Sequence, residues 1–264
     1  MSTYYVRKSG NDSNGGTDPD TDAKLTIASA VSASSNDDTI DIGEGTWEET
    51  INAQRTFLGV NMDKTILSSA HTSITWSGYT IAFQNIRLIL TGDLSEMLPT
   101  TLSFINSFID FSGIIDANIL WRMDAAGETL TMTNSIFYGS AVVEAIVPQL
   151  LRLGAANTAV VTNCVFYRFT DANWVRNSDA TVNVTMKNCI FYNVTSFKPA
   201  NTAAEWTYED YNCWYSSGGT VSETGFSGGE YGEHDILVDP LFVDADGGDF
   251  RLQSSSPCIG AGHA

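Results

Sequence analysis

Acidic side chains and scattered cations are the residues of this sequence that could cut a polysaccharide. A glycosidase needs two carboxylates about 5 to 9.5 Å apart, and a lyase acting on uronates needs a base beside cations that neutralise the sugar carboxylate. The acids and cations of the repeated region share no fixed offset; they are Asp110, Asp116, Asp124, Glu144, Arg122, Arg152, Arg168, Arg176 and Lys187. The sequence therefore predicts no convergent pair for either reaction.

The three histidines and the triplet Asn36-Asp37-Asp38 also give little indication of a catalytic site. His71, His234 and His263 lie in expected loops or at the tail, and no nucleophile is paired with them. In Asn36-Asp37-Asp38, asparagine and aspartate more simply initiate a turn. We predict no catalytic residue, which favours a protein that is not an enzyme.

Two acidic loops space carboxylates two or three residues apart, as calcium-binding loops do. The first holds Asp18, Asp20 and Asp22, and the second holds Asp244, Asp246 and Asp249. Neither has the downstream Glu that supplies a bidentate ligand in an EF-hand, so solvated turns are the simpler interpretation. If calcium binds here, it is expected to be structural, and no other cofactor is predicted.

The charge balance excludes two classes of partner. Among 264 residues, 13 are Lys or Arg and 31 are Asp or Glu, which gives a net charge of −18. This charge repels phosphate backbones and anionic headgroups, so neither nucleic acid nor a membrane is an expected partner.

No leader-like apolar run follows Met1, so we expect synthesis in the cytoplasm without export. Four cysteines without a CxxC pair do not predict a disulfide scaffold.

The elements that must position these residues repeat along the chain. The clearest copies of the repeat are Thr-Met-Thr-Asn134-Ser-Ile-Phe-Tyr, Val-Val-Thr-Asn163-Cys-Val-Phe-Tyr and Thr-Met-Lys-Asn188-Cys-Ile-Phe-Tyr. A shortened copy follows at Asn212, weaker ones precede at Asn85 and Asn106, and the intervals are 21 to 29 residues. Short β-branched and aromatic runs of period two predict strands.

A unit of about 25 residues cannot bury its own apolar face, but coils stacked about 4.8 Å apart can pair every strand with its neighbours. We therefore predict an all-β fold, a single-stranded right-handed parallel β-helix, in one domain over residues 1–264. Residues 1–38 would supply a strand, a loop and a capping helix from Lys24 to Ala33. Residues 39–217 would form the coils, and residues 218–264 a loop and a C-terminal capping segment.

The sequence also resembles the right-handed parallel β-helix, or pectate-lyase-like, superfamily over nearly its whole length. The similar segments are Tyr4-Tyr-Val-Arg-Lys-Ser-Gly-Asn, Asp38-Thr-Ile-Asp-Ile-Gly-Glu-Gly-Thr-Trp47, Asp239-Pro-Leu-Phe-Val-Asp244 and Ser256-Pro-Cys-Ile-Gly-Ala-Gly262. Ala23-Lys24 stands where that family more often has Pro-Phe. The basic motif of pectate lyases and the Gly-His-Gly of polygalacturonases are not found. The resemblance implies the fold, which phage virion proteins and bacterial surface proteins also use.

Period two within each unit predicts which side chains face inward. The residue after the asparagine and the phenylalanine would lie inside, so that Cys164, Cys189 and Cys213 form one interior column. The asparagine suits the bend because it tolerates left-handed backbone and can bond to the next asparagine in a ladder.

The residues of the opposite face would form an apolar strip several coils long, here named the outer strip. Its members are Ile136, Tyr138, Val165, Tyr167, Ile190, Tyr192 and Tyr215. A contiguous apolar patch usually marks a contact surface. Three occupants are open: a loop of the same chain, a second copy or docking partner, and a glycan stacked on the tyrosines.

These features together favour a non-enzymatic structural or adhesion protein. By analogy with β-helix spikes, we expect a phage virion component, either a capsid decoration protein or a small spike. It would assemble as a homotrimer on a capsid or tail protein and lie on the virion surface. Two alternatives stay open: a polysaccharide lyase or glycoside hydrolase of the same fold, and a carbohydrate-binding surface protein.

Overall fold

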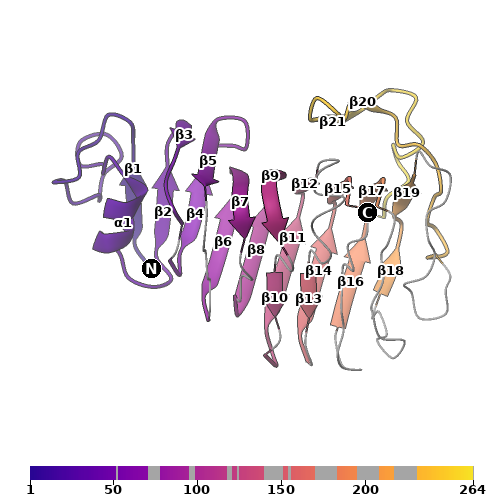
Figure 1. The fold of residues 1–264 in the computed structure, drawn as a ribbon, viewed down its shortest axis with the longest axis horizontal. Coiled ribbons are helices and arrows are strands. Elements are labelled where there is room, and N and C mark those ends of the chain that lie inside the picture. The colour runs from indigo at the N-terminus through magenta and orange to yellow at the C-terminus, as the bar shows by residue number, and fades with distance from the viewer. Residues whose placement is uncertain are drawn as a thin grey trace.

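A computed structural model shows the chain as a stack of parallel coils with one helix at its N-terminal end (Figure 1). The structure describes residues 1–51, 53–70, 78–94, 99–117, 121–123, 125–139, 151–153, 156–169, 183–194, 208–216 and 231–263. The predicted parallel β-helix is confirmed.

One face of the stack is a nine-stranded parallel sheet, whose strands recur once per coil. Its strands, in spatial order, are β1 (Thr3–Val6), β2 (Thr39–Ile42), β4 (Thr56–Gly59), β6 (Thr80–Gln84), β8 (Thr101–Ile105), β11 (Thr129–Thr133), β14 (Thr158–Thr162), β16 (Asn183–Lys187) and β18 (Tyr208–Asp210). The sheet therefore begins with β1, ahead of the region expected to form the coils.

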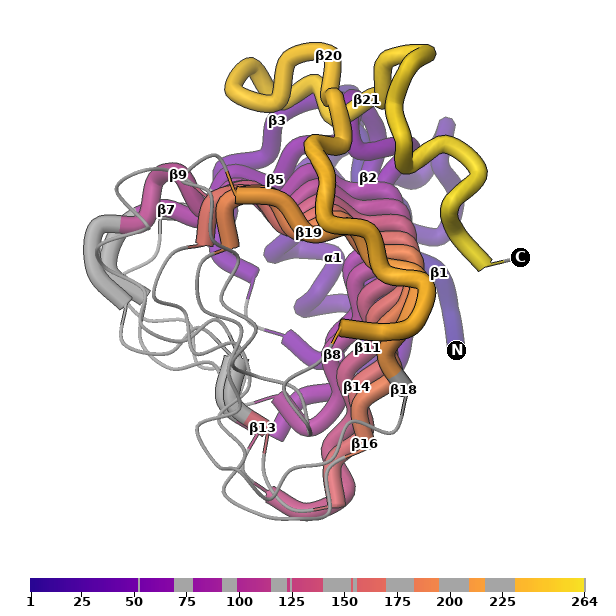
Figure 2. Tube along the Cα trace, turned by 90° about the vertical axis from the view of Figure 1, so that its right-hand side faces the viewer, coloured from indigo at the N-terminus to yellow at the C-terminus, as the bar shows by residue number. Residues whose placement is uncertain are grey.

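A second parallel sheet of eight strands carries the repeated Ile-Phe-Tyr residues. Its strands are β3 (Gly45–Trp47), β5 (Thr65–Ala70), β7 (Arg87–Leu94), β9 (Phe108–Ala117), β12 (Ile136–Tyr138), β15 (Val165–Tyr167), β17 (Ile190–Tyr192) and β19 (Cys213–Tyr215). A further parallel pair joins β10 (Trp121–Met123) to β13 (Leu151–Leu153). Seen along the stack, the successive coils superpose (Figure 2).

The core consists of columns of apolar side chains that run the length of the stack. In the second sheet, one column passes through Trp47, Leu67, Leu88, Ile109, Phe137, Phe166, Phe191 and Trp214. The rings of Phe137, Phe166 and Phe191 stack with centroids 4.9 and 5.1 Å apart. The predicted sidedness is confirmed, because Cys189 and Phe191 are each 1% exposed while the neighbouring outer residues are only partly covered.

The predicted asparagine ladder forms at the bend between the two sheets. Asn85, Asn106, Asn134, Asn163 and Asn188 all have positive φ, between 50° and 58°. The amide Nδ2 groups of three of them donate to the preceding amide oxygen, at 3.2 Å for Asn106 and Asn134 and 3.0 Å for Asn163. Asparagine is thus favoured here by backbone conformation and by side-chain bonding at once.

The last copy of the repeat is displaced by one residue from the predicted alignment. Ile190 pairs with Cys213 and Tyr192 with Tyr215, so Cys213 lies in the isoleucine column of the outer face. The predicted interior column of three cysteines is therefore wrong at its last member. Asn212 is the interior residue beside Cys189, and Tyr211 takes the left-handed bend position with φ of 62°.

The helix α1 (Ile27–Ala33) covers the first coil and lies within the range predicted from sequence. It begins after Thr26, whose side chain accepts from the Ser29 backbone N–H at 3.1 Å. The Glu49 carboxylate accepts from the Ile27 N–H at 2.9 Å. Lys24 is not helical because it bridges to Val6 beside the first strand.

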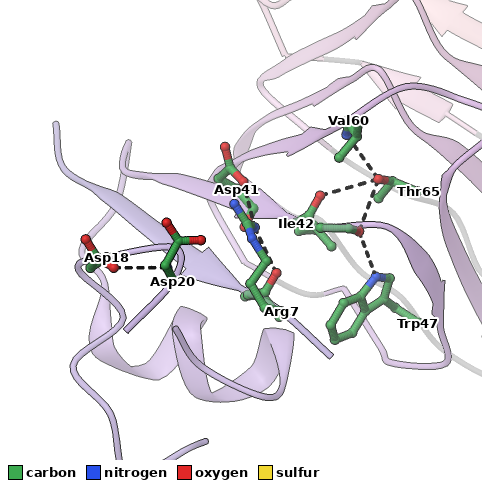
Figure 3. A network of polar contacts seen from close by, with 10 residues as sticks. Arg7, Asp18, Asp20, Asp41, Ile42, Trp47, Val60 and Thr65 are labelled. Atoms are coloured by element: carbon green, nitrogen blue, oxygen red, sulfur yellow. Dashed lines mark hydrogen bonds and ion pairs between the residues drawn. The ribbon is translucent and has the colours of Figure 1, made fainter. Parts of the chain in front are cut away.

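A buried polar network joins the end of β2 to the start of β5 in the next coil (Figure 3). The Thr65 hydroxyl is fully buried, accepts from the Val60 N–H at 3.0 Å and lies 3.3 Å from the Ile42 carbonyl oxygen. At the surface, Arg7 pairs with Asp41 at 2.8 Å. The N-terminal end is thus closed by a helix and by internal hydrogen bonds.

The C-terminal segment closes the opposite end and then runs back outside the stack. Ile236 forms a parallel bridge with Cys213, and its N–H donates to the Asn212 carbonyl oxygen at 2.8 Å. The chain continues into an antiparallel hairpin of β20 (Phe242–Asp244) and β21 (Asp249–Leu252). This hairpin lies over the outer face of the second sheet (Figures 1 and 2).

Candidate functional site

The four tyrosines of the outer strip stack in register on consecutive strands. Tyr138 pairs with Tyr167, Tyr167 with Tyr192, and Tyr192 with Tyr215. Their ring centroids are 5.4, 5.2 and 5.0 Å apart along the column. Ile136, Val165 and Ile190 form the parallel column beside them, each partly covered.

The C-terminal hairpin covers much of this column with two phenylalanines. Phe250 meets Tyr167 edge-on, with centroids 5.2 Å apart and an interplanar angle of 71°, and meets Tyr138 at 6.0 Å. Phe242 contacts Tyr192 at 5.9 Å. As a result Tyr167 is only 1% exposed. Edge-on aromatic contacts of this kind contribute about 0.5 to 1.5 kcal/mol beyond the buried area.

Asp246 at the tip of the hairpin attaches the hairpin to the strip. The Tyr167 hydroxyl donates to the Asp246 carboxylate, and Arg168 forms an ion pair with it at 2.9 Å. The Tyr138 hydroxyl donates to the Asp246 carbonyl oxygen at 3.1 Å. Burial and the bond to Asp246 raise the pKa of Tyr167, so its hydroxyl stays a donor at neutral pH.

Of the three open occupants of the outer strip, a segment of the same chain is therefore in place. The sequence alone did not identify this segment, although Phe242 and Phe250 flank the second acidic loop. Contact of the strip with a second copy or a glycan stays a prediction. A partner approaching over Tyr167 would meet the hairpin first.

The first predicted calcium loop uses its carboxylates in turns. Asp18 accepts from the backbone N–H groups of Asp20 and Thr21, at 2.9 and 2.8 Å (Figure 3). Asp22 accepts from Gly15 N and Thr17 N. These bonds lower the pKa of both carboxyls. The geometry fits the solvated turns considered from sequence.

The second predicted loop also directs its carboxylates to groups of the protein. Asp244 accepts from the Gly247 N–H at 3.1 Å, Asp246 binds Tyr167 and Arg168, and Asp249 pairs with Arg251 at 2.5 Å. Over the ranges that the structure describes, no three His, Cys, Asp or Glu side chains converge as metal ligands would. A structural calcium ion stays a prediction that this geometry does not favour.

The sequence analysis missed a half-buried pair of carboxyls at the last coil. Glu209 occupies the position of Met186 in the interior column of the first sheet, and its carboxyl interacts with that of Asp235. Burial, followed by the neighbouring Asp235 carboxyl, raises the pKa of Glu209 to about 8. A carboxylic acid protonated at neutral pH can donate the hydrogen that two carboxylates would otherwise lack.

Residues of the last coil donate hydrogen bonds to both carboxyls. Asn212 Nδ2 donates to Glu209 at 2.5 Å, and the Asn212 backbone N–H donates to Asp235 at 2.6 Å. The indole Nε1 of Trp214 donates to Asp235 at 2.8 Å. The pair thus joins the segment around Asp235 to the last coil. A carboxyl at an otherwise apolar column position is the signal that could have identified it.

An acid–base pair lies beside these carboxyls, on the outside of the bend. His234 Nδ1 lies 2.8 Å from Asp210 Oδ2, and the His234 backbone N–H donates to the same carboxylate at 2.7 Å. The bond to Asp210 raises the pKa of His234. The pKa of Asp210 is lowered, since its bonds to His234 outweigh the opposing effect of burial. The His234 ring stacks on Tyr211 at 4.4 Å.

These residues border a cavity of about 270 Å³ between the last coils and the C-terminal tail. Its lining includes Tyr211, His234, Cys213, Cys258, Asn188 and Gly262. His263, whose ring meets Tyr211 at 5.0 Å, bonds through its backbone to both ends of the Asn188 amide. The tail therefore takes the place of the next asparagine in the ladder.

The remaining residues that could do chemistry are dispersed. Asp110 pairs with Arg87 at 3.2 Å and Arg168 with Asp246. Asp37 has a φ of 67° and Asp38 accepts from the Ser35 N–H, as the predicted turn requires. Outside the described residues, or with side chains outside them, lie His71, Asp116, Arg122, Asp124, Glu144, Arg152 and Arg176.

Comparison with known proteins adds no assignment. Neither the family models nor the curated proteins give a match to this chain. In the part of the chain with described structure, no helix is both long and apolar enough to cross a membrane. The fold is thus a parallel β-helix, while membership of the pectate-lyase-like superfamily stays an implication of the sequence resemblance.

Proposed function

We propose that this chain is a non-enzymatic structural or adhesion protein, a β-helical rod closed at both ends. One observation carries the proposal. In the described coils, the side chains that could do chemistry are bonded to other residues of the same chain. The outer-strip tyrosines hold Asp246 and Phe250, and Asn212 and Trp214 of the last coil hold Asp235. These groups bind the chain's own C-terminal segment.

The half-buried carboxyl pair is the feature that would best support the alternative of a polysaccharide-cleaving enzyme. Glycosidases hold their two carboxyls about 5 to 9.5 Å apart, with the sugar or a water between them. Glu209 instead accepts from Asn212, and Asp235 accepts from the Asn212 N–H and from Trp214. These partners favour a role in closing the core over a role in catalysis.

The setting that we propose is a phage virion, with the rod as a capsid decoration protein or small spike assembled as a homotrimer. This part of the proposal is supported by analogy with β-helix spikes and by the resemblance of both chain ends to that superfamily. A closed rod suits such a position because capped ends prevent strand-to-strand aggregation.

Sizing by light scattering combined with a cleavage assay tests the proposal. We expect a particle of three 28.6 kDa chains, and no unsaturated or reducing ends released from pectins, alginates or bacterial capsular glycans. A monomer would overturn the homotrimer. Release of sugar ends would overturn the non-enzymatic assignment.

Two variants sharpen the cleavage assay. If cleavage is seen and is lost in Glu209→Gln, the half-buried pair is the active site and the structural reading of it is wrong. Asp20→Asn, at an exposed acid of the first loop, is the matched control and should behave as the parent protein. Glycan binding without any change in chain length would identify the carbohydrate-binding alternative.

A further inference from the structure

Cys213 and Cys258 come from distant parts of the chain and meet at the last coil. Cys213 begins β19 and is 3% exposed, whereas Cys258 belongs to the C-terminal segment and is half-buried. Both line the cavity beside Tyr211, and each thiol is near enough to shift the pKa of the other. Thiols that are neighbours in the folded chain need little backbone movement to form a disulfide.

The surrounding bonds hold both cysteines in place. The Ser256 hydroxyl donates to the Pro240 carbonyl oxygen at 2.5 Å and accepts from the Cys258 N–H at 3.2 Å. The Cys213 thiol lies 3.3 Å from the Val238 carbonyl oxygen. The negative charge of Asp239 acts to raise the pKa of both thiols. The contact is therefore built into the folded C-terminal segment.

We propose that Cys213 and Cys258 are a reversible redox site, which a small disulfide such as oxidised glutathione converts to an intramolecular disulfide. The Cys258 thiolate attacks one sulfur of the reagent, forming a mixed disulfide and releasing one glutathione thiolate. Cys213 then attacks the Cys258 sulfur and releases the second. The two protons of the cysteine thiols pass to the two glutathione thiolates, so two cysteines are oxidised and one glutathione disulfide is reduced.

The roles of the two cysteines follow from their surroundings. The neighbouring Cys213 thiol lowers the pKa of Cys258, although burial opposes it. The neighbouring Cys258 thiol and burial raise the pKa of Cys213. Because the thiolate is the nucleophile, the half-buried Cys258 is the first to react. The cavity of about 270 Å³ gives the reagent a place to approach it.

Cys164 and Cys189 provide an internal comparison. They are also neighbours, on adjacent coils, but each is only 1% exposed inside the stack. Burial raises the pKa of Cys189 well above its ordinary value. Buried cysteines of this kind are inert, so this pair should stay reduced under the same treatment.

Oxidation would link the segment that carries the hairpin to the last coil. The hairpin covers Tyr167, and its attachment otherwise depends on non-covalent contacts. A disulfide restricts the unfolded chain more than the folded one and so favours the closed state. The rod would therefore close more firmly on passing from a reducing to an oxidising compartment.

The test treats the purified full chain with oxidised glutathione and maps its cysteines by mass spectrometry without reduction. We expect two of the four thiols to be lost, a Cys213–Cys258 linked peptide and full recovery in dithiothreitol. Amide exchange of Phe242–Leu252 should slow by at least about tenfold on oxidation. Cys213→Ala should stop at glutathione bound to Cys258, and Cys258→Ala should bind none.

Cys164→Ala is the matched control, and it should form the Cys213–Cys258 link like the parent. Four thiols remaining after treatment would overturn the proposal. So would a Cys164–Cys189 link, a disulfide between chains, or glutathione bound to Cys213 in Cys258→Ala. Unchanged amide exchange in the linked protein would overturn the proposed effect on the hairpin.

Discussion

The middle coils and the last coil have equivalent positions along the stack, but the residues at these positions differ in polarity. In the first sheet, Phe104, Met132, Val161 and Met186 form an apolar interior column, and Glu209 follows Met186. At the bend, asparagines give way to Tyr211. A middle coil has neighbours on both sides, whereas the last coil must end the core and bond to a chain that crosses it.

The difference teaches that departures from the repeat mark the end of the rod. Asp235, the Ile236 backbone and the His263 backbone supply the partners that a further coil would have supplied. Polar residues in the last coil are tolerated because each is bonded. The same substitutions inside the stack would leave buried groups without partners.

The largest effect is expected for a cavity in the middle coils. Phe166 is fully buried between Phe137 and Phe191, so Phe166→Ala should lower the free energy of unfolding by about 3 to 5 kcal/mol. Denaturant unfolding followed by circular dichroism measures it. Val60→Ala, at a residue 49% exposed, is the control and should change little. A loss below about 1 kcal/mol would contradict a continuous packed core.

Breaking the bonds of the last coil should have a smaller and local effect. Asp235→Ala removes the acceptor of Trp214 Nε1 and of the Asn212 N–H, at a cost of about 1 to 3 kcal/mol. Amide exchange should rise in residues 231–263 and stay unchanged in residues 101–117. Asp20→Ala serves as the control. Equal acceleration in both regions would show that the cap is not a separate unit.

The ladder of the middle coils should be sensitive to loss of a single amide. Asn134→Ala removes the bonds to Asn106 and Asn163 and places alanine at a φ of 50°, so a loss of about 1 to 2 kcal/mol is expected. Asn134→Gly keeps the backbone freedom and isolates the contribution of the amide. Thermal unfolding compares the two variants. Equal stability of both with the parent would refute the ladder.

The smallest effect expected is a dependence of the C-terminal cap on pH. The pKa of Glu209 is raised from 4.5 to about 8 by folding. Its contribution to stability is therefore complete below about pH 4.5 and is lost as the pH rises through 8. His234, whose pKa is also raised, loses its contribution in the same direction. Amide exchange of residues 231–263 should accelerate between pH 6 and 9, after correction for intrinsic rates.

Glu209→Gln provides the comparison because its amide cannot ionise. The variant should lose most of this acceleration while His234 retains a smaller one. A parent protein whose cap exchanges at the same corrected rate across this range would show that Glu209 does not interact with Asp235 as described.

Much of the stack could be predicted from sequence because one coil constrains the next. Period two identified Phe137, Phe166 and Phe191 as interior residues, and the asparagine repeat located the bends. The helix was predicted three residues too early because Lys24 bridges to Val6. These features depend on local pattern, which the sequence displays directly.

The candidate site could not be predicted because it depends on contacts distant in sequence. Asp246 meets Tyr167 across 79 residues, and no local pattern brings the hairpin to that strand. The last coil was misaligned because Asn212 offered a match to the repeat where Tyr211 takes the bend. Aligning the repeats by residue type gave the wrong register at the last coil, where the chain that follows is no longer another coil of the repeat.

Solvent accessibility of Tyr167 tests most directly whether the C-terminal segment covers the outer strip. Hydroxyl-radical footprinting of the native protein should label Tyr167 least among the outer-strip tyrosines, because it is 1% exposed beneath Phe250. Phe250→Ala should increase its labelling. Strong labelling of Tyr167 in the native protein, unchanged in Phe250→Ala, would contradict a rod closed by its own C-terminal segment.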